Sequence, residues 1–461
     1  MNVLAPERSV LPDGQRMVTR LAQWIVAARD VRLTGAVRDA ALRALLDLLG
    51  AAAAGVADPG VLAVRRVALG SFGAGSVPLW FTGQAGSAVA AAWANAAAAS
   101  AQDLDDGNRM ARGHPGAAVI PAALAVGAEL AVDFDRILTA IAIGYEVGVT
   151  IGAARTTYGN TGTWSAYAVV ATAAALRGTP VDEIAHALAI AGESAPNQLF
   201  ASAPPPRDLA PEGSHVKEGI PWSVVTGLVA LGLAEAGHSG PRNILDSRRH
   251  YQFADGLRLG ADPRICQCYI KLYACCRHVH APLDAMFALI SEHGIQSVEI
   301  EQVEVETTSG AMRISNQISP QNLTDLQYSI PYCLALGTIS GAGALLPLTP
   351  AALSVPGARD LAARVRLFLN VELDARFPAE TLARVRMAAR GLVFVSEVTA
   401  PRGEADTPLA WDEIADKVMR AGGLTLTHDH LAMLIDAVSA GDICLLAKCL
   451  QKPGCTLQSE M

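Results

Sequence analysis

Ten of the fourteen residues from 88 to 101 are alanine, and this run constrains the fold more than any other feature of the chain. Alanine has the highest helix propensity of the amino acids. Its small side chain gives a helix little apolar surface of its own, so such a helix is stable only when other helices pack closely around it. The run therefore predicts a core helix inside a closely packed helical domain.

A cluster of ionisable residues begins directly after this run. Between residues 103 and 116 the chain holds Asp103, Asp105, Asp106, Arg109, Arg112 and His114. Gly107, Gly113 and Pro115 predict a loop. Loops that carry ionisable groups from the end of a buried helix often form active sites. The alternative is a solvated surface loop, but the apolar neighbouring sequence favours an active site.

The composition indicates the general class of protein. The chain has 461 residues, which suggests two domains. It is 51% hydrophobic with only 5% aromatic residues, and this apolar excess suggests a subunit interface, as in a homodimer. A net charge of −8 without a Lys/Arg run argues against nucleic acid and anionic membranes as partners.

The sequence predicts neither a secretory signal peptide nor a membrane-spanning helix. Residues 1–17 mix charges with prolines and lack the apolar core of a signal peptide. The best candidate for a membrane span, residues 138–154, contains Glu146 and is shorter than the roughly 20 apolar residues required. We therefore expect a soluble cytoplasmic protein.

All eight cysteines follow residue 265, and we expect free thiols rather than disulfides. Cys266 and Cys268 precede Cys275, Cys276 and His280, which raises the question of a zinc site. The spacing matches none of the usual ligand pairs for zinc. The sequence therefore predicts no metal.

Helical periodicity dominates the first part of the chain. Apolar residues recur at i, i+3 and i+4 between residues 17 and 257. The expected helices, separated by Gly, Pro or Asp, are 37–54, 120–130, 134–154, 165–176, 181–191 and 222–236. Three consecutive prolines within residues 201–206 predict a stiff, extended connector.

A period of two appears after Cys266. The expected strands are 298–307, 365–373, 383–387 and 392–398, with helices expected at 281–290, 334–342 and 351–355. Helical periodicity returns from Trp411. We therefore predict a mainly α protein with a large helical domain (1–266), a smaller α+β lid domain (267–405), and C-terminal helices (406–461) that return to the helical domain.

Three further segments carry candidate functional groups. Lys217 lies just before an expected helix, where backbone N–H groups would lower its pKa and favour a role as a base; the alternative is a solvated loop lysine. Lys271, Arg277 and His278 lie at the domain boundary, a common place to bind anions. Tyr328 is either a phenolic acid or base, or a core tyrosine with a hydrogen-bonded hydroxyl.

Several common catalytic signatures do not occur. The chain has no G-x-S-x-G elbow, no G-x-G-x-x-G after a strand and no H-E-x-x-H. Hydrolase, nicotinamide-dependent and metalloprotease functions therefore lack support from motifs.

Taken in order, these segments resemble the MmgE/PrpD family. The stretch from Asn95 through the acidic cluster to His114-Pro-Gly resembles its N-G…H-x-L-D-F-D-D-T…H-P-G/S segment. Gly144-Tyr145-Glu-Val resembles its G-Y-E-V helix. The segment from Lys271 to Asp284 resembles K-x-Y-P-x-C-R…H…D-A, and the segment around Tyr328 resembles Q-F/Y-S-x-P/A-Y.

The resemblance implies a fold, a chemistry and a set of residues. It implies a homodimer of chains with a helical domain and a lid domain, no organic cofactor, and a small polycarboxylate substrate. The catalytic groups of the family correspond to Asp103, His114, Lys217 and Tyr328. Substrate contacts are expected from Arg109, Arg112, Tyr145, Lys271, Arg277 and His278.

Departures from the family pattern favour one reaction. A histidine of the family's G-F-H-P-T-G-T turn is Gly159 here, and its histidine before L-D-F-D-D is Ser100. Losing one proton-transfer group penalises dehydration, which also needs an acid for the leaving hydroxyl. We therefore expect an epimerase that inverts a Cα of iminodisuccinate, with Lys217 and either Tyr328 or His114 as opposed proton carriers. The alternative is a dehydratase or decarboxylase acting on a methylcitrate-like tricarboxylate.

Overall fold

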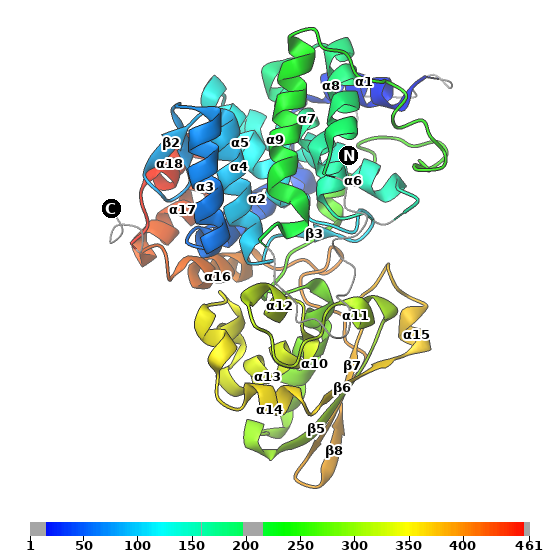
Figure 1. The fold of residues 1–461 in the computed structure, drawn as a ribbon, viewed down its shortest axis with the longest axis vertical. Helices are drawn as coiled ribbons and strands as arrows, with labels where there is room; N and C mark the ends of the chain where they lie inside the picture. The colour runs from blue at the N-terminus through cyan, green and yellow to red at the C-terminus, as the bar shows by residue number, and fades with distance from the viewer. Residues whose placement is uncertain (1–14, 158, 197–214, 456–461) are drawn as a thin grey trace.

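The computed structural model describes residues 15–157, 159–196 and 215–455. Figure 1 shows a large helical body above a smaller part that contains helices and a sheet. The helical body comprises α1 (Met17–Ala28), α2 (Gly35–Gly55), α3 (Pro59–Phe72), α4 (Ala88–Ala101), α5 (Gly116–Leu130), α6 (Phe134–Ala154), α7 (Gly162–Arg177), α8 (Val181–Ser194), α9 (Ile220–Glu235), α16 (Trp411–Gly422), α17 (His428–Ala440) and α18 (Ile443–Gln451).

Short strands accompany these helices. The hairpin of β1 (Val77–Leu79) and β2 (Gln84–Gly86) precedes α4. The second pair joins β3 (Gly107–Asn108) to β4 (Cys268–Tyr269), so the loop after α4 is hydrogen-bonded to the start of the second part of the chain.

The α+β part contains α10 (Arg277–His293), α11 (Ser309–Arg313), α12 (Leu323–Gln327), α13 (Ile330–Ser340), α14 (Ala358–Ala362) and α15 (Val371–Asp374). Its sheet has the order β6 (Val365–Leu369), β5 (Ile300–Thr307), β7 (Arg384–Ala389), β8 (Leu392–Val395). β5 is parallel to β6 and antiparallel to β7, and β7 is antiparallel to β8. The prediction of a mainly helical protein with a smaller α+β region is confirmed.

The alanine run forms α4, the central helix of the body. The side chain of Ser87 accepts a hydrogen bond from the backbone N–H of Ala90, which caps the start of the helix. Helices α2, α3, α5 and α9 all contact α4, and nearly all of its side chains are buried. The expectation of a core helix packed closely among others is therefore confirmed.

Helix α6 is the one described helix that is long and apolar enough to cross a membrane by length and composition. Its bounds agree with the expected 134–154. However, 94% of its most apolar window is buried within the fold. Core helices of water-soluble proteins have this character too, so α6 alone is weak evidence for a membrane protein.

Two expected strands end earlier than predicted, and the one expected at 392–398 stops at Val395. The strand expected at 365–373 stops at Leu369, and Val371–Asp374 forms the short helix α15. The side chain of Asn370 accepts hydrogen bonds from the N–H groups of Glu372 and Leu373, at 3.0 and 3.2 Å. This capping interaction starts the helix and overrides the alternation of apolar residues. The connector expected at 201–206 lies outside the described residues.

The C-terminal helices pack on the N-terminal ones, as Figure 1 shows for α16 and α2. A salt bridge between Lys417 on α16 and Asp47 on α2 is buried completely. The ammonium of Lys417 also donates to the backbone carbonyl of Leu104, at 2.9 Å. Lys417 therefore links two helices to the loop that follows α4.

We predict that Lys417→Met lowers the free energy of unfolding by about 3–5 kcal/mol, because it leaves the buried Asp47 without a counter-charge. Urea titration at pH 7 measures the change. The double variant Asp47→Leu/Lys417→Met removes both charges and should recover most of the loss. Equal stability of Lys417→Met and the wild type would contradict this role.

Candidate active site

The loop that follows α4 places its ionisable side chains at the junction of the two parts of the protein. Asp103 adopts a positive φ of 50°, which is uncommon for a residue with a Cβ atom. Such backbone strain occurs most often at functional sites. The β3–β4 pairing then holds the loop against the segment that carries Lys271.

Asp103 and Lys271 form the central ion pair of the site. Lys271 Nζ lies 3.2 Å from Asp103 Oδ1, and the two side chains are 0% and 7% exposed. An ammonium has three hydrogen-bond donors, and the described residues engage at most one of them. Lys271 therefore retains donors for a ligand in a buried environment.

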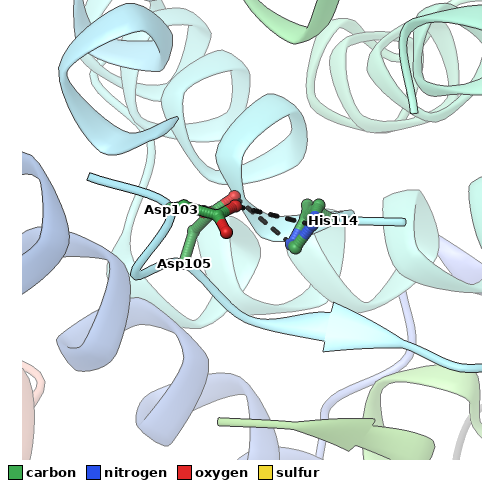
Figure 2. A group of neighbouring side chains, drawn as sticks. All are labelled: Asp103, Asp105 and His114. Atoms are coloured by element: carbon green, nitrogen blue, oxygen red, sulfur yellow. Dashed lines mark ion pairs between the residues drawn. The ribbon is translucent and has the colours of Figure 1, made fainter. Parts of the chain in front are cut away.

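His114 lies beside this pair, surrounded by carboxylates. Figure 2 shows its ring facing Asp103 and Asp105. Nε2 lies 3.9 Å from Asp103 Oδ1 and 4.0 Å from Glu218 Oε1, and Nδ1 lies 3.8 Å from Asp105 Oδ2. Nδ1 is also 2.7 Å from the backbone carbonyl of Asp106, which fixes the proton on Nδ1. Nε2 is thus the atom that gains and loses a proton.

Lys217 approaches from the turn before α9. Lys217, Glu218 and Gly219 all have positive φ angles, so this turn is strained. The ammonium of Lys217 donates to Gln327 Oε1 and lies 5.9 Å from the centre of the Tyr328 ring. Lys217 and Tyr328 are therefore neighbours on one side of the site.

The environments of these groups shift their pKa values in opposite directions. Burial lowers the pKa of Lys217, although Asp103 and Asp105 oppose the shift. Burial and Lys271 would lower the pKa of His114, but Asp105, Glu218 and Asp103 outweigh them and raise it. A base that loses its proton more readily and an acid that keeps it are thus paired in one site. The expected lowering at Lys217 is confirmed, with burial as its main cause.

Asp103 itself remains ionised. Burial would raise its pKa, but the positive charges of Lys271, Lys217 and His114 together lower it. The pKa of Lys271 is raised, because Asp103 and Asp105 outweigh the effect of burial. The pair is therefore charged at neutral pH and interacts electrostatically with both Lys217 and His114.

Asp106 stabilises the loop through hydrogen bonds to the start of α5 and to α6. It accepts hydrogen bonds from the Tyr145 hydroxyl at 2.8 Å and from the Gly116 N–H at 3.0 Å. A Cβ atom on residue 116 would overlap both Asp106 and the Tyr145 hydroxyl, so this contact requires glycine. Tyr145 is buried and its hydroxyl is engaged by Asp106, and its expected contact with substrate stays a prediction.

The arginines that were expected to bind substrate are already engaged by groups of the protein. Arg109 and Arg277 both pair with Glu404, Arg277 at 2.5 Å, and both guanidiniums lie over the Tyr269 ring. Arg112 donates to the backbone carbonyl of Arg155 at 3.3 Å. Glu404 thus neutralises much of the charge of Arg109 and Arg277, and their expected roles in substrate binding stay predictions.

His278 lies apart from the proton-transfer groups. Its ring packs 5.7 Å from the ring of Phe377, and Nδ1 is buried with no hydrogen-bond partner among the described residues. Burial, followed by the nearby charges of Arg109 and Arg313, lowers the pKa of His278 to about 4. This imidazole is therefore neutral at physiological pH, which does not suit an anion contact by charge.

Asp103, Asp105 and His114 also have the composition of a metal site. One potential ligand atom from each lies within 4.8 Å of the others. However, the buried ammonium of Lys271 already supplies a positive charge 3.2 Å from Asp103. A dication beside it would be repelled strongly in this low-dielectric environment. The absence of a metal stays a prediction from these residues.

Several residues of the site were not selected from the sequence. Asp105, Glu218 and Gln327 each lie within two residues of a selected group, so their proximity in sequence was the available signal. Thr161 lies two residues after Gly159, in the turn that corresponds to the family's G-F-H-P-T-G-T turn. The Thr161 hydroxyl accepts a hydrogen bond from the backbone N–H of His114 at 3.0 Å and donates one to the Glu218 carboxylate at 2.7 Å. It therefore holds His114 and Glu218 in place.

The structure joins a helical part to an α+β part, and a cluster of ionisable side chains lies between them. The MmgE/PrpD N-terminal domain matches residues 19–265, and the MmgE/PrpD C-terminal domain matches residues 273–440. The chain therefore belongs to the MmgE/PrpD family, whose members are enzymes that include dehydratases and isomerases. A search for similar curated proteins gave no match.

Asp106 provides a test of the electrostatics. Burial raises its pKa to about 7, from 3.8. The folded state therefore binds a proton more tightly than the unfolded chain, and this contribution to stability is lost as the pH rises towards 7. We predict that the wild type loses roughly 2–3 kcal/mol more than Asp106→Asn between pH 5 and pH 8. Urea unfolding at both values measures this difference, and identical pH dependence would contradict the shift.

Proposed function

We propose that this protein is a cofactor-independent epimerase that inverts a carbon next to a carboxylate in iminodisuccinate. The observation that supports this proposal best is that Lys217, whose pKa is lowered, and His114, whose pKa is raised, both interact electrostatically with Asp103. Epimerisation needs one group to remove a proton and another to return one on the opposite face. Both groups are coupled to the same ionised Asp103.

Lys217 and His114 are the best candidates for the two faces. Tyr328 lies on the same side as Lys217, since its ring is 5.9 Å from the Lys217 ammonium. His114 lies against Asp103, Asp105 and Glu218 instead. In the proposed reaction, neutral Lys217 removes the Cα proton and the electron pair passes to the adjacent carboxylate. Protonated His114 then delivers a proton to the other face, and the groups exchange roles for the opposite isomer.

The charge that develops on the carboxylate requires nearby donors. Lys271 is fully buried and has donors that the described residues do not engage. A fixed cation at this position stabilises the enediolate-like transition state more than it would in water, because the site excludes solvent. Asp103 holds Lys271 and keeps it protonated.

The residue at 159 favours epimerisation over dehydration. Gly159 has no side chain, and the guanidinium of Arg155 fills the space where one would begin. An arginine stays protonated and is a poor acid for a departing hydroxyl. Loss of one general acid typically lowers a rate by about 10²- to 10⁴-fold. Dehydration, which needs that extra acid, is penalised most.

We predict that the wild type incorporates solvent deuterium at Cα of iminodisuccinate and interconverts its stereoisomers, without losing water or carbon dioxide. NMR and chiral chromatography measure both results. Formation of an unsaturated tricarboxylate from 2-methylcitrate, with no exchange into iminodisuccinate, would favour a dehydratase instead.

Variants of the two proton carriers should separate exchange from inversion. We predict that His114→Gln still exchanges the Cα proton of the isomer that faces Lys217, but inverts it about 10²- to 10⁴-fold more slowly. Lys217→Met should show the reverse preference for isomers. Arg390→Gln, in an exposed pair with Glu299, serves as the control for handling and folding. Equal loss of exchange for both isomers in both variants would contradict the assignment to two faces.

A further inference from the structure

Before α7, the guanidinium of Arg155 lies against Gly159. The three atoms nearest to a Cβ on Gly159 would all belong to the Arg155 guanidinium. Gly159 is buried, so the guanidinium is stacked on the backbone of the turn. Any side chain at residue 159 would displace it.

Two polar groups of this turn are buried without a partner. Arg155 Nη1 and Asn160 Oδ1 make no hydrogen bond to any residue that the structure describes. Asn160 is 4% exposed. Buried polar atoms in folded proteins nearly always have partners. The Arg155 guanidinium lies at Gly159 and Asn160 follows it, so both orphans belong to one turn and are available to a ligand.

The turn is attached directly to the proton-transfer groups. Thr161 follows Asn160, accepts a hydrogen bond from the His114 N–H and donates one to Glu218. Its own backbone N–H also donates to Glu218, at 3.1 Å. A ligand held by Asn160 would therefore lie one residue from Thr161, which contacts both His114 and Glu218.

The two orphans differ in polarity, and this difference describes the ligand. Arg155 Nη1 is a charged donor and binds most strongly to an anionic acceptor, for which a carboxylate has matching geometry. Asn160 Oδ1 is an acceptor and requires a donor such as N–H. A ligand with a carboxylate close to an N–H group satisfies both.

We propose that Arg155 and Asn160 form a subsite that selects amino-polycarboxylates, with Arg155 binding a carboxylate and Asn160 accepting a hydrogen bond from the substrate's secondary ammonium. This inference rests on the proposed function, which identifies the reacting carbon, and it adds Asn160 as the residue that recognises the substrate's nitrogen. A tricarboxylate without nitrogen satisfies Arg155 but leaves Asn160 Oδ1 unpaired. Sites built to bond an N–H discriminate strongly against analogues that lack it.

Calorimetric binding to the full-length protein tests the subsite, with iminodisuccinate and propane-1,2,3-tricarboxylate as probes. We expect Arg155→Gln to weaken binding of both probes by about 10- to 100-fold. Arg155→Lys should recover only part of that loss, because it keeps the charge but not the fork of donors. Gly159→Ala should weaken both probes too, since the added Cβ displaces the guanidinium without changing the charge.

Asn160→Ala separates recognition of nitrogen from recognition of carboxylate. We expect it to weaken iminodisuccinate by about 10-fold or more and to leave the affinity for propane-1,2,3-tricarboxylate nearly unchanged. Equal weakening of both probes, or of neither, in a variant that unfolds at the wild-type temperature would overturn the proposal. If Asn160→Ala is unstable, Asn160→Asp keeps the acceptor and should retain the preference for iminodisuccinate.

Arg29→Gln is the matched control. Arg29 is also a partly buried arginine, it donates to the backbone carbonyl of Thr179, and it lies near Gly178 beyond the other end of α7, ~24 Å away. It should bind both probes like the wild type. Deuterium exchange is measured in parallel: exchange with unaltered binding in the Arg155 and Asn160 variants would overturn the subsite alone. Selective binding without exchange would overturn the proposed reaction alone.

Discussion

The ion pair of Asp103 and Lys271 is the interaction on which the site depends. It joins the end of the central helix α4 to the segment that leads into the α+β part, and both side chains are buried. Two charges removed from water are stable only when each has the other and additional polar neighbours. His114, Lys217 and Asp105 are those neighbours, so the charges of these three groups are coupled to this pair.

The helical body makes such burial possible. Because α4 is composed mainly of alanine, four helices approach it closely and leave its C-terminal end deep in the protein. Residues from the α+β part then complete this end. Gln327 donates to the Ala101 carbonyl at 3.3 Å and accepts from Lys217, while Gln102 accepts from the Leu348 N–H at 3.0 Å. The site is therefore assembled only when both parts of the chain are in contact.

Local sequence patterns predicted the elements well and the long-range pairings poorly. Helix α6 matches the expected 134–154, because a long apolar period bounded by capping residues is sufficient to define a helix. The strand at 365–373 was overestimated because a single capping residue, Asn370, outweighed the alternation. Asp47 and Lys417 are 370 residues apart, and no periodicity connects them. The sharing of Glu404 by Arg109 and Arg277 is a similar case.

For the candidate site, too, residues marked by local patterns were predicted and those defined by long-range contacts were not. The acidic loop, His114, Lys217 and Tyr328 were found through residue chemistry and family motifs, and the structure brings them together. Glu218 and Gln327 were missed, because their roles arise from three-dimensional contacts with His114 and Lys217. The expected lowering of the Lys217 pKa was right in direction, but its main cause is burial rather than the expected backbone N–H groups.

The central claim is that the surrounding carboxylates raise the pKa of His114 above its ordinary value. A titration of His114 by ¹⁵N NMR, in the wild type and in Asp103→Asn, tests it most directly. The account predicts a pKa above the ordinary value of 6.5 in the wild type. It predicts a lower pKa in Asp103→Asn, because removing one carboxylate also leaves Lys271 uncompensated. A wild-type pKa below 6.5, or one that Asp103→Asn leaves unchanged, would contradict the account.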